Sequence, residues 1–297
     1  MLSEAFVNKV EESFGNKIIK IEALTDSVTL LYFSDQKVVL KRVNTKVKNI
    51  YNFIASQNVK NVVYPIKQFI FDKNIYFIYK YINNFEYPTE KKIIDLLNNL
   101  SELHSKTSFT IKLNEKNFKY FYRIYKNLDR IFQTLEMLVR ESELKENKTD
   151  YDWIILSKYH VFLKCKKIMY EIQKKIHKYV SNHASCIYCL NHGNLNLNHF
   201  VGGKFLSFDN GYIGIFVSDY AKLFLALDEY DGEWFKIIED KLKSLNNDFY
   251  LLYFKFLVLY IYMINIRFTS FEDSVVLTTY LQIANKVNFF LNLTSSY

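Results

Sequence analysis

The sequence predicts an α+β protein in two lobes, a small five-stranded lobe over residues 1–83 and a larger, mainly helical lobe over residues 84–297. Three observations support this. The first eighty residues are rich in short strand-like runs, helical periodicity takes over after residue 84, and 49% of the residues are hydrophobic against 24% charged. That balance excludes a disordered chain, and 297 residues can enclose a substantial core.

The first lobe alternates β-branched and aromatic runs with polar turn clusters. A short amphipathic helix is expected to end near Gly15, and a second helix is expected over about 47–57. Strands are expected at 17–24, 28–33, 37–43, 67–71 and 74–82, the last two joined by a tight turn at Asp72-Lys73. The order is therefore three strands, one helix and two strands.

The second lobe shows helical spacing of apolar residues from Pro88-Thr89 onward. Long helices are expected over about 116–142 and 153–181. The pattern returns briefly to short strands and turns around 185–210, and helices then continue to the C-terminus.

Composition narrows the function classes. A net charge of +8, with 39 Lys and Arg against 31 Asp and Glu, is too modest and too mixed to indicate nucleic acid as a partner. Seven glycines nearly exclude a glycine-rich phosphate loop, and three cysteines indicate a reducing compartment. The N-terminal residues contain acids and no apolar run, so no secretory signal is expected there.

One apolar stretch, Phe249 to Phe268, is long enough to suggest a membrane span. Lys255, Asn265 and Arg267 interrupt it. We therefore expect a buried helix of the helical lobe and no membrane span, with the membrane as the alternative.

The segment from Leu190 to Phe224 carries the most informative motifs: His192-Gly193, then Ser207-Phe208-Asp209, then Asp219-Tyr220-Ala221. Upstream, Val38-Val39-Leu40-Lys41 lies within the third expected strand, and Leu103-His104-Ser105 ends a helical pattern. In order and spacing these pieces resemble the aminoglycoside and choline phosphotransferases, and most of all their relatives, the bacterial spore-coat kinase-like proteins. The resemblance implies a protein kinase-like fold that binds ATP and Mg²⁺ between its lobes.

The resemblance also implies roles for individual residues. Lys41 would hold the α- and β-phosphates, and backbone groups of Lys80, Tyr81 and Ile82 would meet the adenine. Asp209 would hold Mg²⁺, His192 would belong to the catalytic loop, and Asp219 would brace that loop. Taken alone, Lys41 also fits a solvated strand lysine, and Asp209 a turn residue before Asn210-Gly211.

The chain departs from the family pattern in three places. The catalytic base falls on Asn194, whose amide cannot accept a proton at useful pH. The second metal ligand falls on His199, or on Asn198 after a one-residue shift. Finally, no Asp or Glu lies between Arg42 and Asp72, so the inserted helix offers Lys41 no acidic partner. Neutral hydrogen bonds could instead come from its amide side chains, Asn49, Asn52 or Gln57.

These departures predict a pseudokinase, a non-enzyme that acts through protein binding and binds ATP and Mg²⁺ weakly or not at all. The alternative is an active ATP-dependent small-molecule phosphotransferase that tolerates Asn194 and His199. The resemblance implies a cytoplasmic mother-cell protein that joins the spore coat, with coat or scaffold proteins as partners.

Two further patterns invite other interpretations. His183, Cys186, Cys189 and His192 recur every third residue, but in a strand such positions point to opposite faces, so zinc and redox roles are disfavoured. A run of lysines shares one helical pattern with apolar residues, and its lysines are 164, 166, 167, 174, 175 and 178. We interpret it as the solvated face of an amphipathic helix, with a phosphate- or surface-binding strip as the alternative.

Overall fold

The structure is a computed structural model that describes residues 3–83, 88–116, 118–227, 232–245, 247–266 and 274–295. The chain forms two compact units. One contains Met1–Ser108 and Cys189–Gly214, and the other contains Phe109–Tyr188 and Ile215–Tyr297. The predicted lobe boundary at residue 83 borders residues 84–87, which lie outside the described residues, and it stays a prediction.

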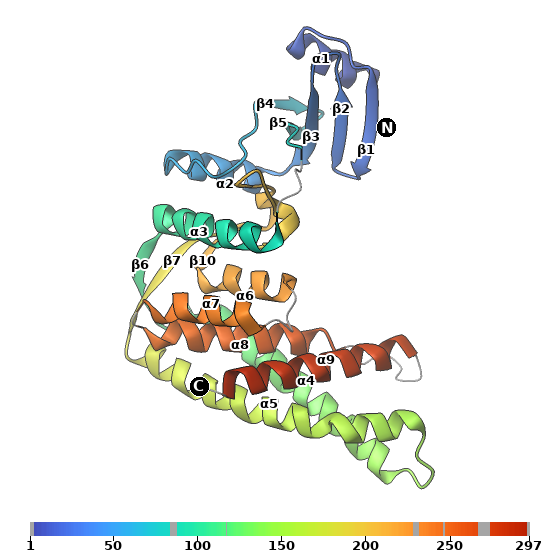
Figure 1. Cartoon of the computed structure of the whole chain (residues 1–297), viewed down its shortest axis with the longest axis vertical. Coiled ribbons are helices and arrows are strands. Elements are labelled where there is room, and N and C mark those ends of the chain that lie inside the picture. The colour runs from blue at the N-terminus through green and yellow to red at the C-terminus, as the bar shows by residue number, and fades with distance from the viewer. Residues whose placement is uncertain are drawn as a thin grey trace. The chain divides into compact units, whose positions relative to one another are not determined.

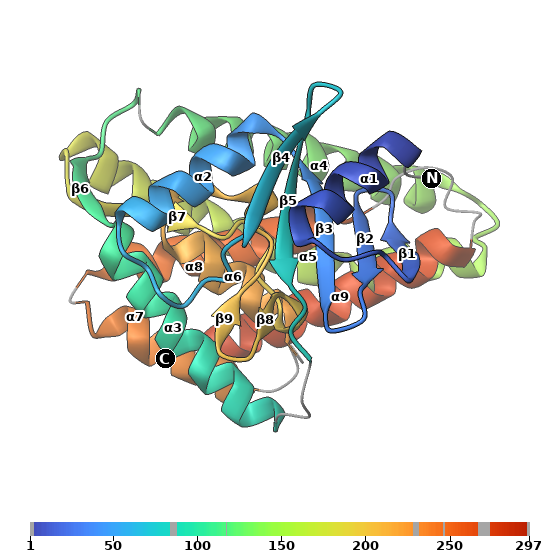
Figure 2. The same cartoon turned by 90° about the horizontal axis from the view of Figure 1, so that it is seen from above.

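The first unit opens with the expected order of elements. They are α1 (Glu4–Phe14), β1 (Lys20–Thr25), β2 (Val28–Tyr32), β3 (Lys37–Val43), α2 (Thr45–Ser56), β4 (Lys67–Phe71) and β5 (Asn74–Lys80). The strands form one antiparallel sheet in the order β1-β2-β3-β5-β4. Figure 2 shows the five strands side by side. The predicted five-stranded sheet with one inserted helix is therefore confirmed.

Alternation along β3 gives the sheet two different faces. Val38 and Leu40 are buried on one face and pack with Leu31 and Ile78 against Phe6 and Val10 of α1. The intervening residues, Val39 and Lys41, point to the other face, opposite Tyr79 and Phe77 of β5 respectively. Lys41 therefore leaves the sheet on the side away from α1.

Local signals in the sequence explain where these elements end. Gly15, with φ +68°, caps α1 in the left-handed conformation, and the Asn44 side chain accepts the Val47 N–H at 2.9 Å where α2 begins. Asp72 and Lys73 both have positive φ, which confirms the tight turn between β4 and β5.

The first unit also contains α3 (Thr89–Thr107) and a later stretch of short elements. That stretch follows β7 (Ser185–Asn191) and comprises η1 (Leu197–His199), β8 (Phe200–Val201), β9 (Lys204–Phe205), η2 (Phe208–Asn210) and β10 (Tyr212–Ile215). Phe205 of β9 accepts a hydrogen bond from the Val63 N–H at 3.0 Å and donates one to the Asn61 carbonyl at 2.9 Å. These bonds fix β9 to the chain between α2 and β4.

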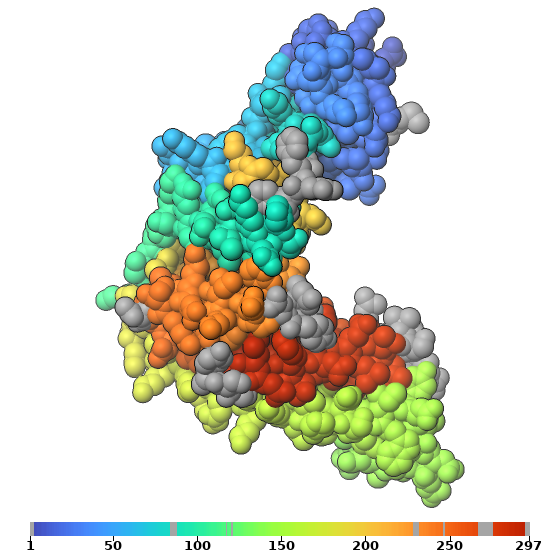
Figure 3. Space-filling model, viewed as in Figure 1, coloured from blue at the N-terminus to red at the C-terminus, as the bar shows by residue number. Residues whose placement is uncertain are grey.

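The second unit is mainly helical. Its helices are α4 (Lys119–Leu144), α5 (Asp150–Ser181), α6 (Val217–Ala226), α7 (Gly232–Lys243), α8 (Asp248–Ile264) and α9 (Ser274–Ser295). One strand was not predicted from the sequence: β6 (Phe109–Lys112) pairs antiparallel with Ser185–Tyr188 of β7. Helix α9 lies against α5, as Figures 1 and 3 show.

The apolar stretch that suggested a membrane span forms α8, which packs against α4, α5, α6, α7 and α9. Its Phe254, Val258 and Met263 are buried within the unit. None of the helices in the described ranges is both long and apolar enough to cross a bilayer. The expected buried helix is therefore confirmed over the described part of Phe249–Phe268, which ends at residue 266.

Helix α5 begins at a capping box built by Thr149 and Asp152. The Asp152 carboxylate accepts hydrogen bonds from the Thr149 N–H at 2.8 Å and hydroxyl at 2.7 Å, and Lys145 Nζ donates to it at 2.8 Å. The Asp152 side chain is buried, and these partners, Lys145 first, hold the pKa of its carboxyl well below its usual range.

We expect Asp152→Asn to lower the free energy of unfolding by about 1–2 kcal/mol at pH 7, because it disrupts the cap. The folded-state pKa of Asp152 is depressed, so its contribution is present above the unfolded-state value of about 4 and is lost as the pH falls below it. Urea unfolding at pH 7 and pH 3 measures both effects. The matched control is Asp150→Asn, an exposed acid in the same first turn. Equal losses for the two variants at pH 7 would contradict this account.

Candidate functional site

An ion pair between Lys41 and Asp209 forms the centre of the candidate site. Lys41 Nζ bonds to Asp209 Oδ2, and it also donates to Ser207 Oγ at 3.1 Å. The Lys41 side chain is 12% exposed and that of Asp209 is 42% exposed. A largely buried ammonium thus meets a carboxylate that remains open to solvent.

Asp209 is held in place by its buried neighbour Phe208. The Phe208 ring packs 4.7 Å from the ring of His192 and 6.0 Å from that of Tyr51 on α2. Ser207, which precedes it, has a left-handed φ of +59°. This turn directs Phe208 inward and Asp209 toward Lys41, so the position of the carboxylate depends on aromatic packing as well as on charge.

His192 is fully buried behind this turn. Its Nε2 lies 2.6 Å from the Leu206 carbonyl, which can only accept, so Nε2 carries the proton. Its Nδ1 then accepts the Asn194 N–H at 3.4 Å. The neutral imidazole joins the residues after β7 to the residue before Ser207, which is a structural role.

Gly193 lies where two backbone segments meet. It has φ +82°, and a Cβ added there would come within 2.0 Å of the Asn210 carbonyl oxygen. Only glycine fits both the conformation and the close approach. The His192-Gly193 motif therefore keeps the chain after β7 next to η2.

Asn194 occupies the position where the resemblance places the catalytic base. It is exposed, and its backbone carbonyl accepts a hydrogen bond from His199 Nδ1 at 2.6 Å. Asn196 caps η1, since its Oδ1 accepts the N–H groups of Asn198 and His199. The arrangement thus orders the loop around Asn194 without supplying a carboxylate at that position.

Of the candidate metal ligands, Asp209 is in contact with Lys41, whereas Asn198 is exposed and His199 is half-buried. Because His199 Nδ1 donates to Asn194, its Nε2 is the nitrogen left to accept or to ligate. The described residues contain no cluster of three or more His, Cys, Asp or Glu that could hold an ion. One carboxylate with a free oxygen suits Mg²⁺ only when the rest of its shell comes from phosphates and water.

The three residues expected to meet adenine lie at the end of β5. Lys80 is the last residue of the strand, and the Tyr81 N–H donates to the Lys37 carbonyl at 3.2 Å. Ile82 is half-buried beside Gly202 of the β8–β9 turn. Lys80 and Tyr81 help to line a hollow of about 420 Å³ with the β2–β3 turn. Because the Tyr81 N–H donates to the Lys37 carbonyl, this backbone group is already used within the sheet.

Asp219 lies in the second unit, in the first turn of α6, and is fully buried. One turn later, burial lowers the pKa of Lys222, and the negative charge of Asp219 opposes that shift. The proposed bracing role of Asp219 stays a prediction.

Sequence reasoning missed Tyr51. The amides suggested as partners from the inserted helix, Asn49, Asn52 and Gln57, are all exposed. Tyr51 instead is 4% exposed, with its ring 5.5 Å from Phe77 and 6.1 Å from Tyr79. Its position in the sequence could have indicated burial, because Tyr51 belongs to the same helix face as Val47, Ile50 and Ile54, which are buried.

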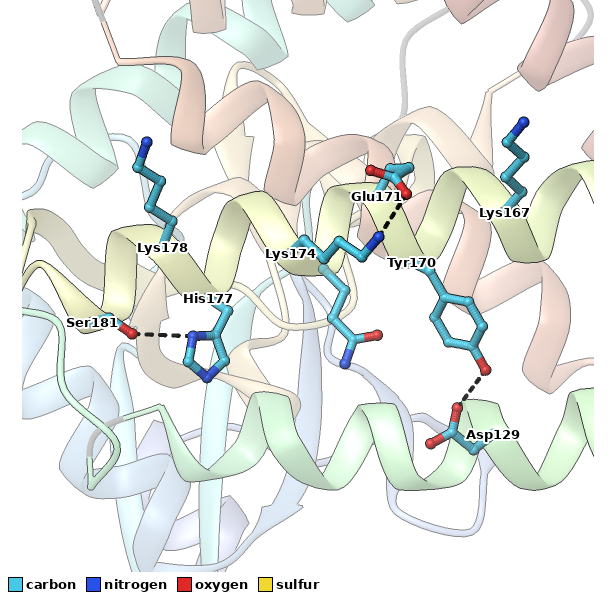
Figure 4. A pocket seen from close by; sticks show the side chains of 9 residues that line it. Asp129, Lys167, Tyr170, Glu171, Lys174, His177, Lys178 and Ser181 are labelled. Carbon is cyan, nitrogen blue, oxygen red and sulfur yellow. Dashed lines mark hydrogen bonds and ion pairs between the residues drawn. The ribbon is translucent and has the colours of Figure 1, made fainter.

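The lysine run falls on α5, as expected. Phe162, Ile172 and Ile176 are buried while most of the lysines are exposed, which confirms the amphipathic helix. A hollow of about 850 Å³ lies along α5 and includes Asp129 of α4. Figure 4 shows Tyr170 and His177 pointing toward α4, whereas Lys167 and Lys178 point the opposite way. Their ammonium groups do not converge on one ligand position.

The His and Cys residues that recur every third position make separate contacts and do not form one site. Cys186 and Cys189 lie on strand β7, both buried and neither in a disulfide, and burial raises the pKa of Cys186 to about 12. His183 Nδ1 lies 3.1 Å from the Leu113 carbonyl, and His192 contacts Leu206. A thiol with a raised pKa is a poor metal ligand and a poor nucleophile.

A sheet with an inserted helix, an ion pair from its third strand and a mainly helical unit define a protein kinase-like fold. Solved structures confirm this. An aminoglycoside phosphotransferase from Alicyclobacillus acidocaldarius matches with a TM-score of 0.66 at 11% identity, over 94% of this chain and 92% of its own. A spectinomycin phosphotransferase in complex with ADP and spectinomycin matches with a TM-score of 0.58 at 9% identity, over 99% of each chain.

Choline kinase from Streptococcus pneumoniae matches with a TM-score of 0.50 at 13% identity, over 99% of each chain. No protein-family model and no curated protein sequence matches this chain. At these identities the likeness shows a shared fold. The predicted kinase-like α+β fold is confirmed, and the function must be argued from the site.

We expect Gly193→Ala to destabilise the protein by at least about 2 kcal/mol, because the added Cβ must displace the Asn210 backbone. The matched control is Gly203→Ala, which has φ +73° but no atom within 4 Å of the added Cβ. It should cost only the left-handed strain, about 1 kcal/mol. Urea unfolding of both variants measures the difference, and equal losses would show that the close approach is unimportant.

Proposed function

We propose that this chain is a spore-coat-type pseudokinase, a protein with a phosphotransferase fold that binds nucleotide weakly and acts through protein binding. The observation that carries the proposal is the direct pairing of Lys41 with Asp209 in a site where Asn194 stands at the base position. The two charged groups best suited to a nucleotide are kept, and the group best suited to proton transfer is absent.

Loss of turnover follows from the chemistry of Asn194. An amide can donate and accept hydrogen bonds but cannot take the proton of an acceptor hydroxyl at neutral pH. Removal of an essential catalytic group costs several powers of ten in rate. In addition, Lys41 has no carboxylate partner from α2, since residues 43–71 contain no Asp or Glu.

Weak nucleotide binding follows from the ion pair itself. Phosphates that approach Lys41 also meet the negative charge of Asp209, so they must compete for the ammonium. Mg²⁺ carried by the nucleotide would offset this by binding the free oxygen of Asp209. Phosphotransferases of this fold have been solved with ADP and with AMP, which supports a nucleotide as the ligand class.

Protein binding at the spore coat is the part of the proposal that depends on the sequence resemblance. Strand β1, at one edge of the sheet, adds a surface suited to such contacts. Ile21 and Leu24 on this strand are 44% and 51% exposed, and Ile19 beside it is 70% exposed. An edge strand with exposed aliphatic residues favours association with other proteins. We propose coat or scaffold proteins as the partners and the mother-cell cytoplasm as the place of synthesis.

We expect ATP with Mg²⁺ to raise the melting temperature in a concentration-dependent way, as ligand linkage requires, without phosphate release above background. Thermal shift and a phosphate-release assay on the purified full chain measure the two effects. Asp209→Ala should abolish the thermal shift. An unmoved melting temperature at saturating ATP and Mg²⁺ would show that the nucleotide site is vestigial.

The variant Asn194→Asp tests the loss of turnover separately. It restores a carboxylate at the base position but leaves Lys41 without an acidic partner on α2, so we expect no phosphate release above background. Robust transfer by this variant would show that the missing acid matters little. Transfer by the unmodified protein would support the alternative of an active phosphotransferase that tolerates Asn194 and His199.

We expect a tagged copy of the protein to join the coat during sporulation, and Asp209→Ala to join it equally well, because the proposed role needs contact surface and no chemistry. Fluorescence microscopy through sporulation measures this. Failure of the tagged protein to reach the coat would remove the coat assignment. A coat defect caused by Asp209→Ala in a still-folded protein would mean that the nucleotide site is used there.

A further inference from the structure

The hydroxyl of Tyr51 is a buried polar group without a completed hydrogen bond. The residue is 4% exposed, and its oxygen has no partner at standard hydrogen-bond geometry among the described residues. Its ring is wedged among Phe77 at 5.5 Å, Phe208 at 6.0 Å and Tyr79 at 6.1 Å, so the hydroxyl cannot turn to solvent. Buried polar groups are nearly always paired, and an exception in a native fold needs an explanation.

This hydroxyl lies near Tyr79 of β5 and near the turn that carries Asp209. The Tyr79 hydroxyl and the N–H groups of Ser207 and Phe208 approach it without reaching standard hydrogen-bond geometry. Burial, and to a smaller extent the negative charge of Asp209, raises the pKa of Tyr51 to about 12. The phenol therefore keeps its proton at neutral pH and remains a donor beside a carboxylate.

Asp209 has Lys41 as its charged partner in this structure. A triphosphate that binds Lys41 must draw the ammonium away from Asp209, at least in part. Helix α2 contains no acid that could pair with Lys41, and its Tyr51 packs against Phe208, the residue that precedes Asp209. The donor that lacks a bond therefore lies next to the acceptor that loses one.

We propose that Tyr51 is a positioning residue of the nucleotide site, whose hydroxyl donates a hydrogen bond to the Asp209 carboxylate when a nucleotide triphosphate draws Lys41 away. The inference rests on the proposed nucleotide binding. Tyr51 does not touch the nucleotide in this account. It keeps Asp209 oriented. Its hydroxyl has no hydrogen-bond acceptor in the free protein and gains one, the Asp209 carboxylate, in the complex.

The variant Tyr51→Phe removes the one oxygen and leaves the ring. We expect it to raise the dissociation constant for ATP with Mg²⁺ by about 10- to 150-fold, the effect of losing one hydrogen bond to a charged group. The melting temperature of the free protein should be unchanged or higher, because an unpaired buried hydroxyl is removed. Isothermal titration calorimetry and thermal unfolding of the full chain measure the two quantities.

The matched control is Tyr64→Phe. The Tyr64 ring lies 6.4 Å from that of Tyr51, but its hydroxyl donates a made hydrogen bond to the Val59 carbonyl at 2.6 Å. This variant should show the opposite pattern, with a lower melting temperature and an unchanged dissociation constant. The two single-oxygen deletions thus separate a positioning role from a structural one.

Each other outcome has a definite meaning. If Tyr51→Phe binds ATP as the unmodified protein does, the inference is wrong while the proposed nucleotide binding stands. If it loses affinity and melting temperature together, Tyr51 is structural and the inference is wrong. If the unmodified protein binds no ATP, both the proposed nucleotide binding and the inference are wrong.

Discussion

The ion pair between Lys41 and Asp209 connects the sheet of the first unit to the chain that follows β7. Lys41 is fixed because β3 is a central strand whose alternate residues, Val38 and Leu40, are buried against α1. Asp209 is fixed because Phe208 is buried behind it. The His192 side chain, which donates to the Leu206 carbonyl, joins the start of residues 192–211 to this turn.

The proposed function assigns the same two residues to nucleotide binding. In the free protein the ammonium and the carboxylate satisfy each other, which stabilises the turn and weakens the attraction for phosphate. A ligand must exchange partners with a contact that is already made.

Aromatic packing supports the candidate site and the helical unit alike. The chain has 26 Phe and 24 Tyr but only 7 Gly. In the first unit, Tyr51, Phe77 and Phe208 form the support beneath Asp209. In the second unit, Tyr253 and Phe256 of α8 contact Phe121 of α4, and Phe249 contacts Phe118, the residue before α4. This packing accounts for the burial of the strongly apolar α8 within the helical unit.

The sequence by itself determined the order of strands and helices in the first lobe, since alternation and turn residues such as Asp72-Lys73 are local properties. It also predicted Lys41, Asn194 and Asp209 as residues of one site, because their spacing follows a recognisable pattern. It did not reveal β6, whose four residues owe their strand conformation to pairing with β7. Nor did it reveal that Lys41 pairs with Asp209 or that Tyr51 lies beneath them. Those contacts join residues more than 150 positions apart, and only tertiary packing decides which side chains meet over such a separation.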